Sequence, residues 1–240
     1  MNTQTYQGRR RQIEHYFDRT AVEAWKRLTS DAPVGRIRAT VRAGRDEMRS
    51  TLLNWLPSDL TGRRILDAGC GTGSFAIEAA LRGADVIAID LSPTLVDYAQ
   101  NRADQELGHT RQTASKGRIR FFAGDMLDKS LGDFDHVVAM DSIIHYVPAH
   151  SMKMLTQLSN RTRESILFTF APRTPALTMM HAVGRFFPRS DRAPAIEPVD
   201  AHVLRGHFAA EPALSDWQVH RTHRVTSGFY ISQALELVKT

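Results

Sequence analysis

The sequence has little cysteine and no long apolar run, and each of these absences excludes a class of protein. Cys70 is the single cysteine among 240 residues, which excludes an internal disulfide framework and favours a reducing compartment. No uninterrupted apolar run reaches the ~18 residues that a membrane-spanning helix needs. The polar residues at positions 2–4 do not resemble a signal peptide. We therefore expect a soluble, cytoplasmic globular protein, long enough to bury a full core.

The positive charge is concentrated in the first fifty residues. The net charge is +5, and residues 1–50 hold eleven Lys and Arg against six Asp and Glu. Such a segment is compatible with nucleic acid, an anionic membrane surface or an acidic substrate, and equally with a solvated amphipathic helix. Apolar residues recur there at helical spacing, which predicts helices, one of them from about Ile37 to Trp55.

The most informative stretch is a glycine-rich turn that follows a short apolar strand. Residues 65–73 read Ile-Leu-Asp-Ala-Gly-Cys-Gly-Thr-Gly, and a helical segment begins at Ser74. Glycines at this spacing allow positive φ and let a ligand approach the backbone. Asp67, on the approach to the turn, would repel a phosphate but suits an ammonium or sulfonium group. The stretch therefore favours S-adenosylmethionine over a dinucleotide. Cys70, between two of the glycines, is expected to be a small packed side chain rather than a reactive thiol.

A second acidic residue stands about 20 positions beyond the turn. Asp90 ends an apolar stretch that begins at Asp85, and this is where ribose hydroxyls are commonly held in nucleoside-binding folds. Together with Asp67 it predicts a nucleoside cofactor. The alternative is a structural glycine turn with a buried capping aspartate.

Strand and helix patterns alternate from residue 64 to residue 170. This alternation predicts parallel strands with right-handed crossovers in a doubly wound α/β sheet, with ligands at the carboxyl ends of the strands. A further strand is predicted at 218–225, and either a strand or a frayed helix at 228–238. The five alternating strands are expected at Arg64–Asp67, Asp85–Asp90, Arg118–Ala123, His136–Met140 and Ile166–Phe170.

Residues 60–170 resemble the class I S-adenosylmethionine-dependent methyltransferases. The resemblance implies a Rossmann-like, mostly parallel sheet of seven strands. The glycine turn would wrap the methionine part of the cofactor, Asp67 would face its amino group, and Asp90 would take the ribose hydroxyls. Residues 124–126 match the loop that contacts adenine. The cofactor-binding residues that the resemblance implies are Asp67, Gly69, Gly71, Gly73, Asp90, Leu91, Asp125, Met126 and Met140.

The flanking segments resemble a narrower family, the magnesium-protoporphyrin O-methyltransferases of chlorophyll and bacteriochlorophyll synthesis. The segments that carry this resemblance are 14–18, 24–28, 41–45, 140–146, 187–190 and 227–232. They imply methylation of one propionate carboxylate of Mg-protoporphyrin IX, giving the monomethyl ester and S-adenosylhomocysteine, with no protein-bound metal. One position departs from the family. Some relatives carry a tyrosine just after the Trp25 helix, where this chain has Thr29.

The reacting carboxylate is expected close to His145, which lies just beyond the fourth strand. This histidine could hydrogen-bond the propionate or accept its proton, and the alternative is a histidine that caps a loop. The aromatic residues before position 30 could stack on the macrocycle, although their helical spacing fits core packing as well. Arg42 or Arg45 could pair with the second propionate. The substrate-contacting residues expected are Tyr16, Trp25, Arg42 and Tyr146.

The resemblance also implies how the chain is organised and what it contacts. Residues 1–58 would form a helical arm that caps the substrate, and residues 59–240 the methyltransferase domain. A lid-like insertion is expected at 172–200. Contacts with the porphyrin-binding subunit of magnesium chelatase and with the membrane surface are expected, but none with nucleic acid. Two alternatives stay open: a methyltransferase of another small metabolite or RNA, and a non-catalytic porphyrin- or cofactor-binding protein.

Overall fold

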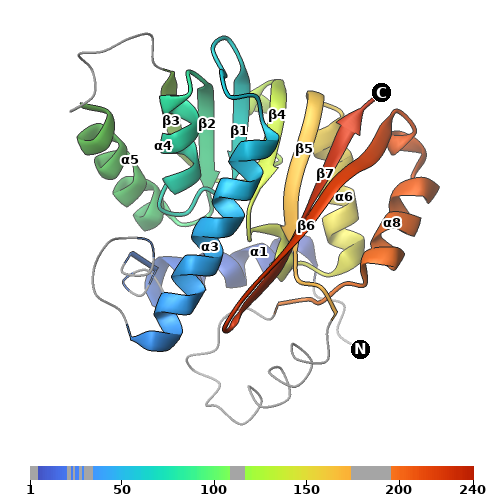
Figure 1. Ribbon diagram of the computed structural model, residues 1–240, viewed down its shortest axis with the longest axis horizontal. Coiled ribbons are helices and arrows are strands. Elements are labelled where there is room, and N and C mark those ends of the chain that lie inside the picture. The colour runs from blue at the N-terminus through green and yellow to red at the C-terminus, as the bar shows by residue number, and fades with distance from the viewer. Residues whose placement is uncertain are drawn as a thin grey trace.

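A seven-stranded sheet forms the centre of the computed structural model, which describes residues 5–20, 23, 25–26, 29, 35–108, 117–173 and 196–240. The strand order is β3-β2-β1-β4-β5-β7-β6, as Figure 1 shows. Strands β1 to β5 are parallel, and β7 runs antiparallel to both of its neighbours. The strands are β1 (Arg64–Ala68), β2 (Asp85–Asp90), β3 (Arg118–Ala123), β4 (Phe134–Ala139), β5 (Thr162–Phe170), β6 (Trp217–Ser227) and β7 (Tyr230–Lys239). The predicted doubly wound, mostly parallel sheet is confirmed.

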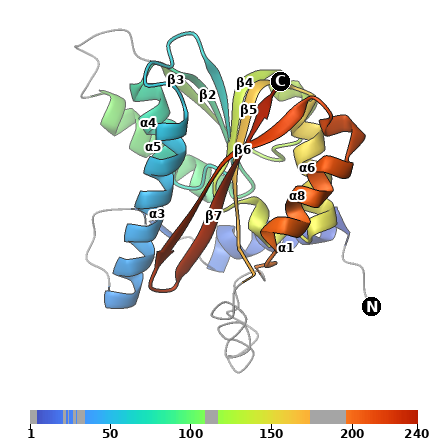
Figure 2. The same ribbon diagram turned by 45° about the vertical axis from the view of Figure 1, so that its right-hand side comes forward.

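Helices cover both faces of this sheet. Helices α3, α4 and α5 pack on one face and α6 and α8 on the other (Figure 2). Helix α1 crosses below the carboxyl ends of the parallel strands (Figure 1). The helices are α1 (Tyr6–His15), α3 (Arg36–Trp55), α4 (Ser74–Leu81), α5 (Pro93–Gly108), α6 (Pro148–Ser159) and α8 (Ala201–Ala210). The shorter helical turns are η1 (Tyr16–Thr20), η2 (Lys129–Leu131), η3 (Ile143–His145) and η5 (Pro212–Leu214).

The core forms two layers because the central strands carry apolar side chains on both faces. Every residue of β4 is buried, as expected for an interior parallel strand. Met48 and Leu52 of α3 are fully buried on one side of the sheet, and Met154 and Leu155 of α6 on the other.

Several boundaries differ from the sequence predictions. β5 begins at Thr162 rather than Ile166, and β4 ends at Ala139. The segment that could have been a strand or a frayed helix is strand β7, because it pairs with both β5 and β6. The sequence analysis missed helix α8. Its signals are the Asp200 carboxylate, which caps the first turn, and the buried pair Leu204 and Phe208 at helical spacing.

The predicted insertion at 172–200 can be followed only at its two ends. Pro172 and Val199 form an isolated bridge, and residues 174–195 lie outside the described residues, so the lid prediction is not tested. Among the helices that the structure describes, none is long and apolar enough to span a membrane.

Candidate active site

A cleft at the carboxyl edge of the parallel strands brings together most of the predicted site residues. Its empty volume is about 1020 Å³, including the open mouth. Residues from the N-terminal segment, α3, the turn after β1, the end of β2 and the turn after β4 line it. In such sheets ligands bind beyond the carboxyl ends of the strands, so this is the predicted place.

The glycine turn between β1 and α4 forms one wall of the cleft. Gly69, Gly71 and Gly73 have φ values of 89°, 53° and 77°, a region that favours glycine. A Cβ on Gly69 would lie 2.3 Å from the Cβ of Ser142, and one on Gly71 would lie 3.2 Å from the Trp25 Nε1. The turn therefore needs glycine both for its backbone conformation and for space. Gly69 and Gly71 line the cleft, whereas Gly73 is the N-cap residue that precedes α4.

Asp67 lies at the floor of the cleft with its carboxyl group buried. The residue is 2% exposed. Burial, and then the negative charge of Asp90, raise its pKa to about 8. Within the described part of the chain its Oδ2 has no hydrogen-bond partner, although buried polar atoms are normally paired. An ammonium group in the cleft would supply the missing partner and favour the ionised form. The residues present thus fit the amino group of S-adenosylmethionine.

Asp90 fixes the turn from the end of β2. Its Oδ2 accepts from the Gly71 N–H at 2.9 Å and its Oδ1 from the Ser92 N–H at 3.0 Å. Burial raises its pKa. Asp90 and Leu91 both line the cleft, where the carboxylate has further acceptor capacity for a ligand hydroxyl. Cys70 is buried and its pKa is raised by burial, which fits a packed thiol.

The loop after β3 places its two predicted cofactor residues differently. Met126 lines the cleft and is 8% exposed. The Asp125 side chain does not belong to the lining. Its carboxylate accepts from the Tyr6 hydroxyl at 2.9 Å and from Arg10 at 2.9 Å. Both donors come from α1, so Asp125 ties that helix to the sheet. Its predicted contact with adenine stays a prediction.

His145 ends the helical turn η3 and lines the cleft, as predicted. The residue is 7% exposed, and its ring centre lies 5.6 Å from that of Phe17. Its carbonyl accepts from the Arg9 Nε at 2.6 Å. An arginine of α1 therefore fixes the backbone of this turn, and Met140, which also lines the cleft, precedes the turn.

The predicted aromatic residues divide into those inside the cleft and one outside. Trp25 and Tyr146 line it, and Tyr146 stacks on Tyr6 with ring centres 5.4 Å apart. Burial raises the Tyr146 pKa, so its hydroxyl is protonated at neutral pH. Tyr16 is not among the lining residues, and its neighbour Phe17 is. Phe17 lies four residues beyond Ile13, which also lines the cleft, so the two share one helical face.

The α3 side of the cleft carries positive charge. Arg42 lines the cleft together with Arg45 and Arg49; its contact with the substrate stays a prediction. Arg45 bonds Asp141, which follows β4, at 2.7 Å. The sequence analysis gave Asp141 no role. Its signal would have been an acidic residue directly after a buried parallel strand, at the ligand edge of the sheet.

Comparison with known proteins identifies the family. A magnesium-protoporphyrin O-methyltransferase of Rhodobacter capsulatus is 47% identical over 228 residues, which cover 95% of each chain. The chain belongs to the magnesium-protoporphyrin O-methyltransferase family. The family model for the magnesium-protoporphyrin IX methyltransferase C-terminus matches residues 139–239, and a general methyltransferase-domain model matches residues 65–165. The family predicted from the sequence is therefore confirmed.

Solved structures agree with this assignment. The magnesium protoporphyrin IX methyltransferase of Synechocystis with bound SAH superposes with a TM-score of 0.81 at 26% identity. The match covers 96% of this chain and 99% of the other. A curated Synechocystis relative is 28% identical and covers 95% of each chain. The class I methyltransferase fold is confirmed over nearly the whole length.

Proposed function

We propose that this protein transfers the methyl group of S-adenosylmethionine to a propionate carboxylate of Mg-protoporphyrin IX. The products are Mg-protoporphyrin IX monomethyl ester and S-adenosylhomocysteine. The observation that carries the proposal is the 47% identity to the Rhodobacter capsulatus enzyme along 95% of both chains. The cleft supports it, because the arginines of α3 line the same cleft as Asp67, whose Oδ2 has no partner among the described residues.

The chain's own residues bind and align the two reactants. Asp67 receives the cofactor's amino group, Asp90 its ribose, and Met126 lies against its base. When bound, the sulfonium supplies an electrophilic methyl group. A propionate is already ionised at neutral pH, so the protein gains rate mainly by holding the carboxylate in line with that methyl group and by excluding water.

His145 is the residue that we propose beside the reacting centre. It is buried, it lines the cleft beyond β4, and Arg9 fixes the backbone that carries it. Its imidazole donates a hydrogen bond to the ionised propionate, or accepts the proton when the acid form binds.

Aromatic and basic residues form the proposed porphyrin side. Trp25 and Tyr146 offer flat surfaces, and Arg42 offers a cation for the second propionate. Tyr16 does not line the cleft, but its ring contacts that of the lining residue Phe17 edge-on, with ring centres 5.1 Å apart. Residues 1–58 act as the substrate-capping arm of the methyltransferase domain at 59–240. Contacts of α1 with Asp125 and with the His145 carbonyl support that division of roles.

The basic N-terminal segment supports a peripheral location at the membrane surface and contact with the porphyrin-binding subunit of magnesium chelatase. Co-sedimentation with anionic and neutral vesicles, and with the chelatase subunit, tests these contacts. If the protein sedimented equally with anionic and neutral vesicles, the proposed electrostatic attraction of the N-terminal segment to the membrane would be contradicted.

The activity is tested with purified protein, S-adenosylmethionine and Mg-protoporphyrin. Chromatography is expected to show one monomethyl ester and an equal amount of S-adenosylhomocysteine. A parallel reaction with metal-free protoporphyrin measures whether the enzyme requires the magnesium ion of its substrate. Cofactor binding by calorimetry without any ester would contradict the proposed substrate and leave the fold-level assignment intact.

A further inference from the structure

Asp141 has an unusual backbone conformation at the ligand edge of the sheet. Its φ is 52°, and among the described residues it is the only non-glycine with positive φ. Such a conformation is strained and persists when surrounding contacts over-determine it. Its N–H donates to the Thr169 Oγ1 at 2.7 Å, and that hydroxyl donates back to the carboxylate at 3.0 Å.

The strands beyond β4 hold the Asp141 carboxylate in place. The Tyr230 hydroxyl donates to it at 3.1 Å, and the Ser232 Oγ at 3.2 Å. Both donors come from β7. Arg45 completes the set with an ion pair of 2.7 Å, in which the two side chains are 17% and 6% exposed. Three elements of the fold, β5, β7 and α3, therefore converge on one carboxylate.

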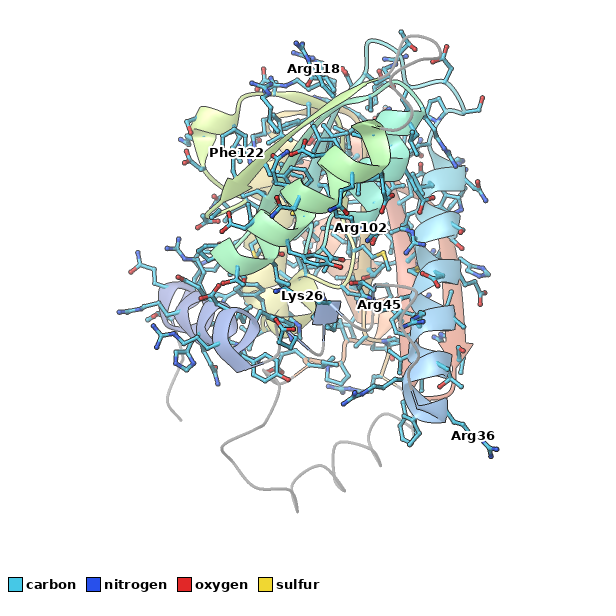
Figure 3. The ribbon with its side chains drawn as sticks, turned by 90° about the vertical axis from the view of Figure 1, so that its left-hand side faces the viewer. Lys26, Arg36, Arg45, Arg102, Arg118 and Phe122 are labelled. Carbon is cyan, nitrogen blue, oxygen red and sulfur yellow. The ribbon has the colours of Figure 1, made fainter. Side chains whose placement is uncertain are left out.

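Helix α3 is positioned so that Arg45 reaches this carboxylate. A Cβ on Gly44 would lie 2.5 Å from the Cδ1 of Tyr230. Any side chain at position 44 would therefore push α3 away from β7. Figure 3 shows Arg45 on the side of α3 that faces the body of the protein, whereas Arg36 projects away at the start of the helix.

The Arg45 guanidinium stands between the Asp141 carboxylate and the cofactor turn. Its central carbon lies 4.5 Å from the centre of the Trp25 ring, and Trp25 in turn covers Gly71. Within the described residues, the guanidinium has one hydrogen bond, from Nη1 to Asp141. No described residue accepts from the other N–H donors of this guanidinium group, which lies on the wall of the cleft.

An adjacent hydroxyl extends this polar wall. The Ser142 Oγ is inaccessible to solvent and has no hydrogen-bond partner among the described residues. It lies 3.0 Å from the place of a Cβ on Gly69. Two side chains with unused hydrogen-bonding capacity therefore flank the point where the glycine turn meets the turn after β4.

We propose that Arg45 orients the reacting carboxylate, and that Asp141 acts through Arg45 by neutralising its charge. This inference rests on the proposed function. A carboxylate oxygen forms the new C–O bond, and the S–CH₃ bond breaks with its electron pair staying on sulfur. No proton moves when the ionised carboxylate reacts.

The charge balance explains why an ion pair suits this task better than a lone arginine. The carboxylate loses its negative charge as the ester forms, so a full cation stabilises the bound substrate more than the transition state. An arginine paired with Asp141 still offers directional N–H donors for a planar carboxylate. Because Asp141 neutralises its charge, such an arginine attracts the negatively charged bound substrate less strongly than a lone arginine would.

Asp141→Asn tests the neutralising role, because asparagine tolerates positive φ and keeps an acceptor for Tyr230 and Ser232. Without the negative charge of Asp141, the charge of Arg45 is no longer neutralised. We therefore expect Asp141→Asn to lower both KM for Mg-protoporphyrin and kcat by about tenfold.

Arg45→Ala is expected to raise KM and to lower kcat by about 100-fold. In the double variant, Asp141→Asn has no further effect. The matched control is Arg205→Ala, an exposed cation on α8 that does not line the cleft, which leaves both constants unchanged.

Porphyrin binding separates this inference from the proposed reaction. With S-adenosylhomocysteine present, Arg45→Ala should weaken binding of Mg-protoporphyrin but not of its dimethyl ester, which has no carboxylate. This binding measurement does not depend on ester formation. If the wild type forms no ester, only the proposed reaction is contradicted, and the inference about Arg45 is still tested by binding. Equal weakening for both porphyrins, or Asp141→Asn raising KM with an unchanged melting temperature, would overturn the inference.

Discussion

The two sides of the cleft are built in different ways. The cofactor side consists of the turn at 67–73 and Asp90. The hydrogen bond that links them, from the Gly71 N–H to the Asp90 carboxylate, joins residues 19 positions apart in the sequence. The acceptor side consists of α3, the turn after β4 and β7, and its central ion pair joins Arg45 to Asp141 across 96 residues. The first side depends on backbone conformation within one βαβ unit. The second depends on the packing of distant elements.

The largest expected effect comes from crowding the cofactor side. Gly69→Ala combines a φ of 89° with a Cβ 2.3 Å from that of Ser142. We expect affinity for S-adenosylhomocysteine to fall on the order of 100-fold, or about 2.7 kcal/mol, in calorimetric titrations.

Gly62→Ala separates backbone strain from crowding. Gly62 has a φ of 77°, with open space where the Cβ would stand. It should destabilise the fold by about 1 kcal/mol and leave cofactor affinity unchanged. If Gly69→Ala bound as tightly as the wild type, the turn would not be the rigid wall described above.

The acceptor side is expected to affect turnover more than cofactor binding. His145→Ala should lower kcat about 100-fold, because it removes the donor and base beside the propionate. Calorimetry should find S-adenosylhomocysteine affinity nearly unchanged. His202→Ala, on the exposed start of α8, is the control. Equal losses in kcat and cofactor affinity would place His145 on the cofactor side instead.

The raised pKa of Asp67 predicts a pH dependence that belongs to the cofactor side. Below its pKa of about 8, the carboxyl must release a proton before it can pair with the ammonium group. Cofactor affinity should therefore rise with pH, by up to about tenfold per unit between about pH 5 and 7. Titrations in buffers of different ionisation enthalpy measure the released proton.

The same shift has the opposite sign for the stability of the ligand-free protein. The folded state holds a proton that the unfolded state lacks between about pH 4 and 8, so stability falls as pH rises through this window. Asp67→Asn should remove this dependence in thermal melts and also the proton release. Proton release that persists in the variant would contradict the assignment.

The smallest effect concerns α1, which bridges the two sides. Tyr6→Phe removes the 2.9 Å hydrogen bond to Asp125 and keeps the ring on Tyr146. The free energy of unfolding should fall by about 1 kcal/mol in denaturant titrations. Tyr98→Phe is the control, since within the described residues no hydrogen bond of its hydroxyl is found. A large loss of cofactor affinity in Tyr6→Phe would make Asp125 a cofactor residue that α1 positions.

Sequence reasoning was strongest where the chemistry is local. Asp67, the glycine turn and Asp90 could be read directly, since positive φ and a carboxylate at a strand end are properties of neighbouring residues. It was weaker along the N-terminal helices. Tyr16 and Phe17 fit one helical pattern equally well, and only the structure shows that Phe17 lines the cleft. Asp125 matched the family loop that contacts adenine, yet its carboxylate accepts hydrogen bonds from Tyr6 and Arg10 of α1.

The sequence by itself determined the cofactor class, the doubly wound fold and the family of this protein, because glycine spacing, strand periodicity and terminal carboxylates are encoded over short stretches. Only the tertiary structure decided the partners of Asp141 and the place of Arg45. Those contacts need the crossing of α3 over β7, and their energies depend on a burial that sequence spacing does not contain. The same holds for the Asp67 pKa, which follows from the loss of solvent around the carboxyl group.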